Sequence, residues 1–206
     1  MLKAFTAGLL LIMLSELGDK TFFIAMLLAM RHSRRLVYIG VVTALAAMTI
    51  ISVFVGQIIS LLPQSYIHYG EVLLFLGFGI KLLYDASQMP NDSCEAEVKE
   101  ASLVVEQAEK ELPPQVNSLA IILEAFGLTF VAEWGDRTQI ATIALAASNN
   151  PYAVTLGAIL GHAICAVIAV VGGRMIAGRI SERIITAIGG SLFIAFGAIA
   201  LFDKSW

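Results

Sequence analysis

The chain has 206 residues, of which 58% are apolar and 14% are charged, and its formal net charge is −3. A soluble domain usually has about 25% charged residues, so this composition indicates a protein whose solvent is lipid. The sequence contains no basic stretch interleaved with aromatic residues, which excludes nucleic acid as a partner and leaves the lipid bilayer as the expected surroundings.

Six segments are apolar over a length that can cross a bilayer as a helix, which takes about 20 residues. In chain order they are residues 4–30, 36–62, 68–88, 119–147, 152–178 and 183–203. The prolines fall between these segments, and short connections such as 31–35 and 148–151 favour antiparallel neighbours. The predicted fold class is therefore an all-α membrane protein with six transmembrane helices.

An acidic linker, residues 90–117, separates the third predicted span from the fourth and divides the chain into the units 1–89 and 118–206. Apolar residues of the stretch 95–112 fall near one helical stripe, so an amphipathic helix is one reading. The other reading, which the high charge favours, is a solvated tether with partial helicity.

Positive charges in the short loops predict how the chain is oriented. Arg31, Arg34 and Arg35 fall on the same side as the linker, whereas the opposite side receives only Lys3 and Lys204. Short cytoplasmic loops carry an excess of Lys and Arg. The linker is therefore expected to be cytoplasmic, with both termini on the opposite side.

The two halves carry the same motif, Glu-x-Gly-Asp-Lys/Arg-Thr, at residues 16–21 and 133–138. The offset of 117 residues also aligns Gly40 with Gly157, and toward the end of each half the offset becomes 118. Because each unit has an odd number of spans, the second unit must enter the membrane in the opposite orientation. The sequence therefore predicts two inverted three-helix repeats, with their motifs facing each other near the midplane.

Charged side chains at bilayer depth cost about 2.5–3.5 kcal/mol each, so the charged residues of both motifs require an explanation. Residues three and four apart share a helix face, and the glycine between the acids permits close helix approach or a local break. The predicted metal ligands are Glu16, Asp19, Glu133 and Asp136. The predicted supporting residues are Gly18, Lys20, Thr21, Gly135, Arg137, Thr138, Gln139 and His162.

The chemistry of these side chains suits a hard divalent cation. Four carboxylates and two cations leave −2, and carboxylate, hydroxyl and amide oxygens are the ligands of Ca²⁺, Mg²⁺ and Mn²⁺. Protons can neutralise the same carboxylates, which is the minimum requirement for proton-coupled exchange. No bound cofactor is expected, because the metal ion is the substrate, and no thiolate cluster favours copper or zinc.

The roles of three supporting residues stay open at this point. Lys20 and Arg137 either orient the carboxylates, lower their proton affinity or replace the ion in an empty site. His162, isolated in the fifth predicted span, either relays protons or packs between helices with a hydrogen bond to a carbonyl group.

The motifs have three other readings: structural salt bridges, a uniporter or channel, and an enzyme. Structural salt bridges alone would leave the two excess negative charges unexplained. A uniporter or channel could use the same acids as a selectivity ring. An intramembrane protease would need Asp19 and Asp136 to share a proton. The adjacent Lys20 and Arg137 do not suit that chemistry, so the chain is not expected to be an enzyme.

The duplicated motif in a chain of six to seven spans resembles the Gdt-type family of cation/proton antiporters. The stretches 15–25 and 157–163, together with the compact length, look similar to its cyanobacterial and chloroplast manganese exporter branch. This resemblance implies Mn²⁺ and Ca²⁺ as substrates, exchanged for protons, with the motif acids as ligands. It implies metal export from the cytosol across a bacterial cytoplasmic membrane or a thylakoid membrane. The sequence leaves a homodimer open.

Overall fold

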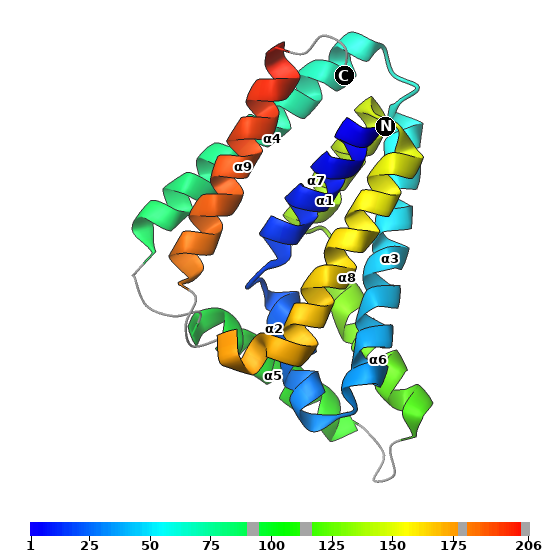
Figure 1. The fold of residues 1–206 in the computed structure, drawn as a ribbon, viewed down its shortest axis with the longest axis vertical. Helices are drawn as coiled ribbons and strands as arrows, with labels where there is room; N and C mark the ends of the chain where they lie inside the picture. Colours follow the sequence, from blue (N-terminus) through cyan, green and yellow to red (C-terminus); the bar gives the residue numbers. More distant parts are fainter. Residues whose placement is uncertain (90–94, 112–116, 177–180, 203–206) are drawn as a thin grey trace.

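The computed structural model describes residues 1–89, 95–111, 117–176 and 181–202. Within these ranges the elements are all α-helices (Figure 1): α1 (Leu2–Glu16), α2 (Lys20–Arg31), α3 (Arg34–Ile59), α4 (Gln64–Gln88), α5 (Glu95–Glu111), α6 (Ser118–Ala132), α7 (Arg137–Ser148), α8 (Pro151–Ile176) and α9 (Glu182–Phe202). The linker ends, 90–94 and 112–116, and the last residues of the fifth and sixth predicted spans, 177–178 and 203, lie outside the described residues.

Two predicted spans, 4–30 and 119–147, are not continuous helices, because each is broken at its motif into two helices. Gly18 and Gly135 lie at φ +80° and +83°, in the left-handed region that side chains other than glycine disfavour. In both breaks the aspartate N–H donates to the carbonyl of the preceding motif glutamate, at 3.3 Å for Asp19 and 3.1 Å for Asp136. The two motifs therefore form the same kind of turn, as the duplicated sequence indicates.

Four described helices, α3, α4, α8 and α9, are long and apolar enough to cross a membrane. A fifth crossing results if α6 and α7, which meet at 76°, are counted as one broken span. The chain is therefore a multi-pass membrane protein, whereas six spans arranged as inverted repeats remain a prediction.

Two apolar cores lie one above the other in the molecule. One joins α2, the first half of α3, α5, α6 and the second half of α8, with Phe23 and Leu28 fully buried in it. The other joins α1, α4, α7, α9 and the first half of α8, with Leu11, Phe75 and Phe193 at its centre. Because α1 passes into α2 and α6 into α7 between these cores, both helix breaks lie in the middle of the protein (Figure 1).

Close packing of α1 on α8 and of α6 on α3 depends on glycine. A Cβ atom at Gly157 would lie 2.2 Å from the carbonyl oxygen of Phe5, and one at Gly40 would lie 2.5 Å from that of Ile122. The two glycines are 117 residues apart in the sequence, and so are their two partners. In each half, the first part of the broken helix therefore packs against a helix of the opposite half: α1 against α8, and α6 against α3. Equivalent residues make the two contacts.

The linker contains a docked helix, α5, which crosses the end of the molecule opposite the N-terminus (Figure 1). Ala101 and Val105 are fully buried, and α5 packs mainly against α2. The amphipathic reading of the linker is thus confirmed for residues 95–111. The solvated-tether reading is wrong there, because the apolar stripe has a partner helix to cover it.

Candidate metal centre

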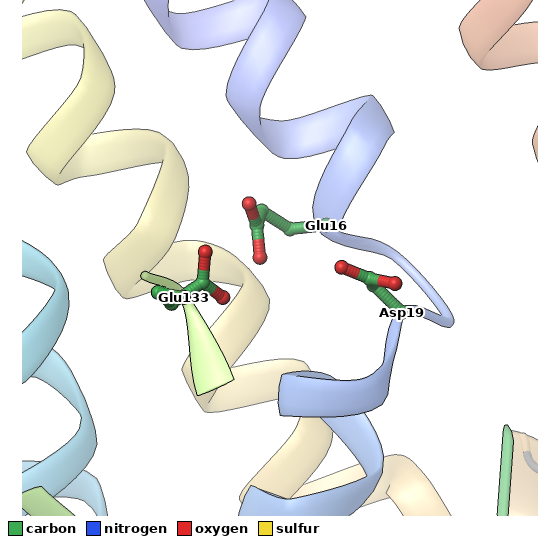
Figure 2. Close-up of side chains that lie close together, drawn as sticks. All are labelled: Glu16, Asp19 and Glu133. Atoms are coloured by element: carbon green, nitrogen blue, oxygen red, sulfur yellow. The ribbon is translucent and has the colours of Figure 1, made fainter. Parts of the chain in front are cut away.

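The two motif glutamates end the first half of each broken helix and point toward each other (Figure 2). Glu16 is the last residue of α1, and Glu133 follows the last residue of α6. Each side chain is only 3% exposed, although both are acidic. The helix breaks therefore bring two buried carboxylates from distant parts of the chain into one place.

Asp19 completes a cluster of three carboxylates (Figure 2). One oxygen each of Glu16, Asp19 and Glu133 lie within 4.8 Å of one another. The oxygen ligands of one hard cation lie about 2.0–2.6 Å from it, and hence up to about 5 Å apart. The cluster has the dimensions of a single-ion site.

Both motif glutamates have an oxygen without a partner. Oε1 of Glu16 and Oε1 of Glu133 are buried and accept no hydrogen bond. Burying an ionised carboxylate without compensation costs several kcal/mol. The pair therefore needs a cation or protons, which is the chemistry predicted from the sequence.

The two threonines of the motifs act differently. The Thr21 hydroxyl donates to Oε2 of Glu16 over 3.3 Å, which places it beside the cluster. The hydroxyl and backbone N–H of Thr138 both donate to Oδ2 of Asp136, over 3.0 and 3.1 Å. Gln139 also supports the turn, because its side-chain oxygen accepts a 2.7 Å hydrogen bond from the N–H of Gly135.

Asp136 was predicted as a fourth ligand, but it does not belong to the three-carboxylate cluster. It is the N-cap of α7, a position where a side-chain oxygen accepts from the first turn of a helix. Its Oδ1 lies 3.8 Å from Nε of Arg137, whose Nη2 lies 3.8 Å from Oδ1 of Asp19. Arg137 therefore lies between the two aspartates.

Lys20, the counterpart of Arg137, is turned away from the cluster. Its Nζ forms an ion pair with Oε1 of Glu100, on the linker helix α5. The count of −2 from the sequence therefore changes, because Arg137 is the one motif cation that contacts the motif carboxylates in the described structure. Formally, four carboxylates and one guanidinium carry −3.

His162 of α8 lies near both motif glutamates. It lines a small cavity beside Glu133 and another beside Glu16. The ring is 5% exposed, and its Nδ1 has no hydrogen-bond partner. The two roles that the sequence left open for His162, proton relay and helix packing, remain predictions.

Three acidic residues outside the motifs were missed by the motif argument: Glu71 and Glu124 in predicted spans, and Glu100 in the linker. Glu71 is buried in α4 and Glu124 is half-buried in α6, and an acid in an apolar helix by itself suggests function. Glu124 Oε2 lies 3.8 Å from Nε2 of His32. No sequence signal identifies Glu100 as the partner of Lys20, because that contact joins residues 80 positions apart.

Substituting Gly135 tests the helix break directly. A Cβ atom at this position meets nothing within 4 Å, so Gly135→Ala changes only the backbone preference. We expect a loss of about 1–2 kcal/mol in stability, the cost of the left-handed conformation for a non-glycine residue. Gly135→Asn is the matched control, because asparagine tolerates this conformation, and it should lose less. Equal thermal unfolding midpoints for both variants would contradict the assignment.

Comparison with known proteins gives a consistent result across the chain. A family model described as "Divalent cation/proton antiporter GDT1" matches residues 4–90 and 121–206. A GDT1-like protein from Synechocystis is 60% identical over 204 residues, covering 99% of both chains. GDT1-like protein 5 of Arabidopsis thaliana is 40% identical, covering 98% of this chain and 96% of its own.

A chloroplast relative is longer than this chain. The PAM71-homolog protein of Arabidopsis thaliana is 41% identical over 216 residues, which cover 97% of this chain and 59% of its own length. No solved structure shows a significant match.

Proposed function

This chain belongs to the GDT1 family of divalent cation/proton antiporters, and on that premise we propose that it exchanges Mn²⁺ or Ca²⁺ for protons and exports the metal from the cytosol. Its relatives belong to the cyanobacterial and chloroplast branch of the family. The family consists of transporters rather than enzymes, which disfavours the intramembrane protease alternative.

One observation carries the proposal: the buried, partly unpartnered carboxylates of Glu16 and Glu133, with Asp19 beside them. A low-dielectric site disfavours net charge, so we expect both loaded states to be neutral. With a formal charge of −3, the neutral states hold either one divalent ion and one proton or three protons. The exchange then moves two protons for each metal ion.

We propose that the two halves are inverted repeats, as the duplicated motif predicts. The packing supports this, because α4 and α9 also meet through equivalent positions. A Cβ atom at Gly79 would lie 2.7 Å from Ile194, and one at Gly197 would lie 2.7 Å from Leu76. An offset of 118 residues relates both pairs. The three proposed units, 1–89, 90–117 and 118–206, follow from this repeat.

The contacts of the α4–α9 pair depart from this symmetry. Within the pair, α4 packs against α7 and α9 packs against α1. The repeat would relate these two contacts to contacts of α9 with α2 and of α4 with α6. Among the described residues, neither of those forms a comparable interface. A cavity of about 140 Å³ lies between the pair and the motifs, and its lining includes Asp19, Arg137 and, next to the linker, Met89. This supports a state in which the central site opens toward the linker side.

We further propose that this open side faces the cytosol. The arginines near the linker support that orientation through the positive-inside rule. A second state, in which the α4–α9 pair packs against α2 and α6 instead, would expose the site to the opposite side. The membrane is proposed to be a bacterial cytoplasmic or a thylakoid membrane, as in the resemblance described above.

The test is ion flux in proteoliposomes that contain the purified chain and an internal pH indicator. An inward Mn²⁺ or Ca²⁺ gradient should drive proton efflux, and a pH gradient should drive metal uphill. Competition among Mn²⁺, Ca²⁺ and Mg²⁺ then ranks the substrates. Metal flux that is indifferent to the pH gradient would refute exchange and support a uniporter or channel.

A further inference from the structure

A second acidic cavity lies at the end of the molecule opposite the linker helix. It has a volume of about 260 Å³ and lies between the first turns of α4 and Ser148, the last residue of α7. The α4 helix begins at the end of the fold where the N-terminus lies (Figure 1). This cavity is separate from the one that leads to the motifs.

Glu71 is the acidic residue of this cavity, and no described side chain forms an ion pair with it. The side chain is 2% exposed, and both carboxylate oxygens lack a hydrogen-bond partner. The hydroxyl of Ser148 lies beside it but donates to the carbonyl of Ala144 over 3.2 Å. No lysine or arginine is among the described lining residues. A buried carboxylate in this state is neutralised by a cation or by a proton.

The repeat relates this cavity to the one on the linker side. An offset of 118 residues carries Ile67, His68 and Glu71 of α4 onto positions in α9 that line the other cavity: Ile185, Thr186 and Gly189. The two cavities therefore occupy equivalent places at opposite ends of the α4–α9 pair. Only Glu71 is acidic among these equivalent residues, so its carboxylate has no counterpart in α9.

The helix α7 connects the cavity with the central cluster. Asp136 caps its first turn and Ser148 is its last residue. A helix of 12 residues is about 18 Å long, so Glu71 is too far away to share an ion with Glu16 and Glu133. Any ion at Glu71 therefore occupies a second position, one helix length from the first.

We propose that Glu71, with the side-chain oxygens of Ser148 and Gln64, binds the transported divalent cation as a second station on the side opposite the linker. This inference rests on the proposed function and adds a site to it. Carboxylate, hydroxyl and amide oxygens are ligands for the same hard cations as the central site. These donors line a cavity of about 260 Å³, which is wider than the cavity of about 140 Å³ beside the motifs. The second station therefore binds the ion weakly and passes it to or from the membrane surface.

The first test measures transport from each side separately. Vesicle orientation is determined by labelling Cys94 of the linker with an impermeant maleimide, and Mn²⁺ is then supplied on one side at a time. Glu71→Gln should raise the KM for Mn²⁺ on the side opposite the linker about tenfold, the lower end of what losing a metal-site group costs. The KM on the linker side should not change, and Glu71→Asp should restore most of the loss. The proposal would be overturned if Glu71→Gln had the same KM as the native chain on each of the two sides.

The second test measures binding without transport. In the Glu16→Gln/Glu133→Gln variant, electron paramagnetic resonance titration with Mn²⁺ should detect a remaining weak site, which Glu71→Gln removes. No remaining site, or one that Glu71→Gln leaves intact, would refute the second station. The native chain could bind Mn²⁺ at Glu71 and yet exchange no metal for protons. That result would refute the proposed function but not the second station.

Discussion

Replacement of Glu16 or Glu133 by glutamine is expected to lower metal-driven proton exchange by roughly 100-fold, because losing one partner of a buried charge pair costs about 3 kcal/mol. Glutamine keeps the shape of the side chain but cannot hold a proton in exchange for a metal ion. Both residues are buried, and each has an oxygen without a hydrogen-bond partner. Initial rates in proteoliposomes give the result.

The matched control is Glu106→Gln, the same change on the exposed face of the linker helix α5. It should keep near-native exchange, since it lies outside the carboxylate cluster. Mn²⁺ binding should fall in parallel with exchange in the two motif variants. Full exchange in either Glu16→Gln or Glu133→Gln would show that the cluster is not the transport site.

Gly157→Ala is expected to destabilise the protein by about 3 kcal/mol, the upper end for overpacking a close-packed interior. Its Cβ atom would lie 2.2 Å from the carbonyl oxygen of Phe5 and 3.0 Å from the backbone N of Leu9. Backbone atoms cannot rotate away as a side chain can, so α1 and α8 must separate. For a chain of this size, the unfolding midpoint in detergent should fall by roughly 6–12 °C.

Gly127→Ala is the matched control, because a Cβ atom at this helical position meets nothing within 4 Å. Alanine is favoured over glycine in a helix by about 1 kcal/mol, so this variant should be as stable as the native chain or more so. Since α1 carries Glu16, Gly157→Ala should also reduce exchange. An unchanged midpoint would mean that α1 and α8 pack less closely than described.

The sequence predicted the helical class and the duplicated motif, because each depends on a local pattern, and it gave the amphipathic linker helix as the less favoured of two readings. Apolar runs, helical periodicity and repeated letters are all visible in one chain. The sequence also suggested a break at each motif glycine, because glycine permits the left-handed conformation found at Gly18 and Gly135. It did not predict that both predicted spans would be interrupted there.

Tertiary structure decided which of the predicted residues come together. Glu16, Asp19 and Glu133 form the cluster, whereas Asp136 caps α7 and Lys20 pairs with Glu100. The buried position of Glu71, near the start of an apolar span, also appeared only in the fold. These outcomes depend on how helices pack against partners distant in the sequence. A one-dimensional pattern shows which side chains share a helix face, but it does not show which other helix that face meets.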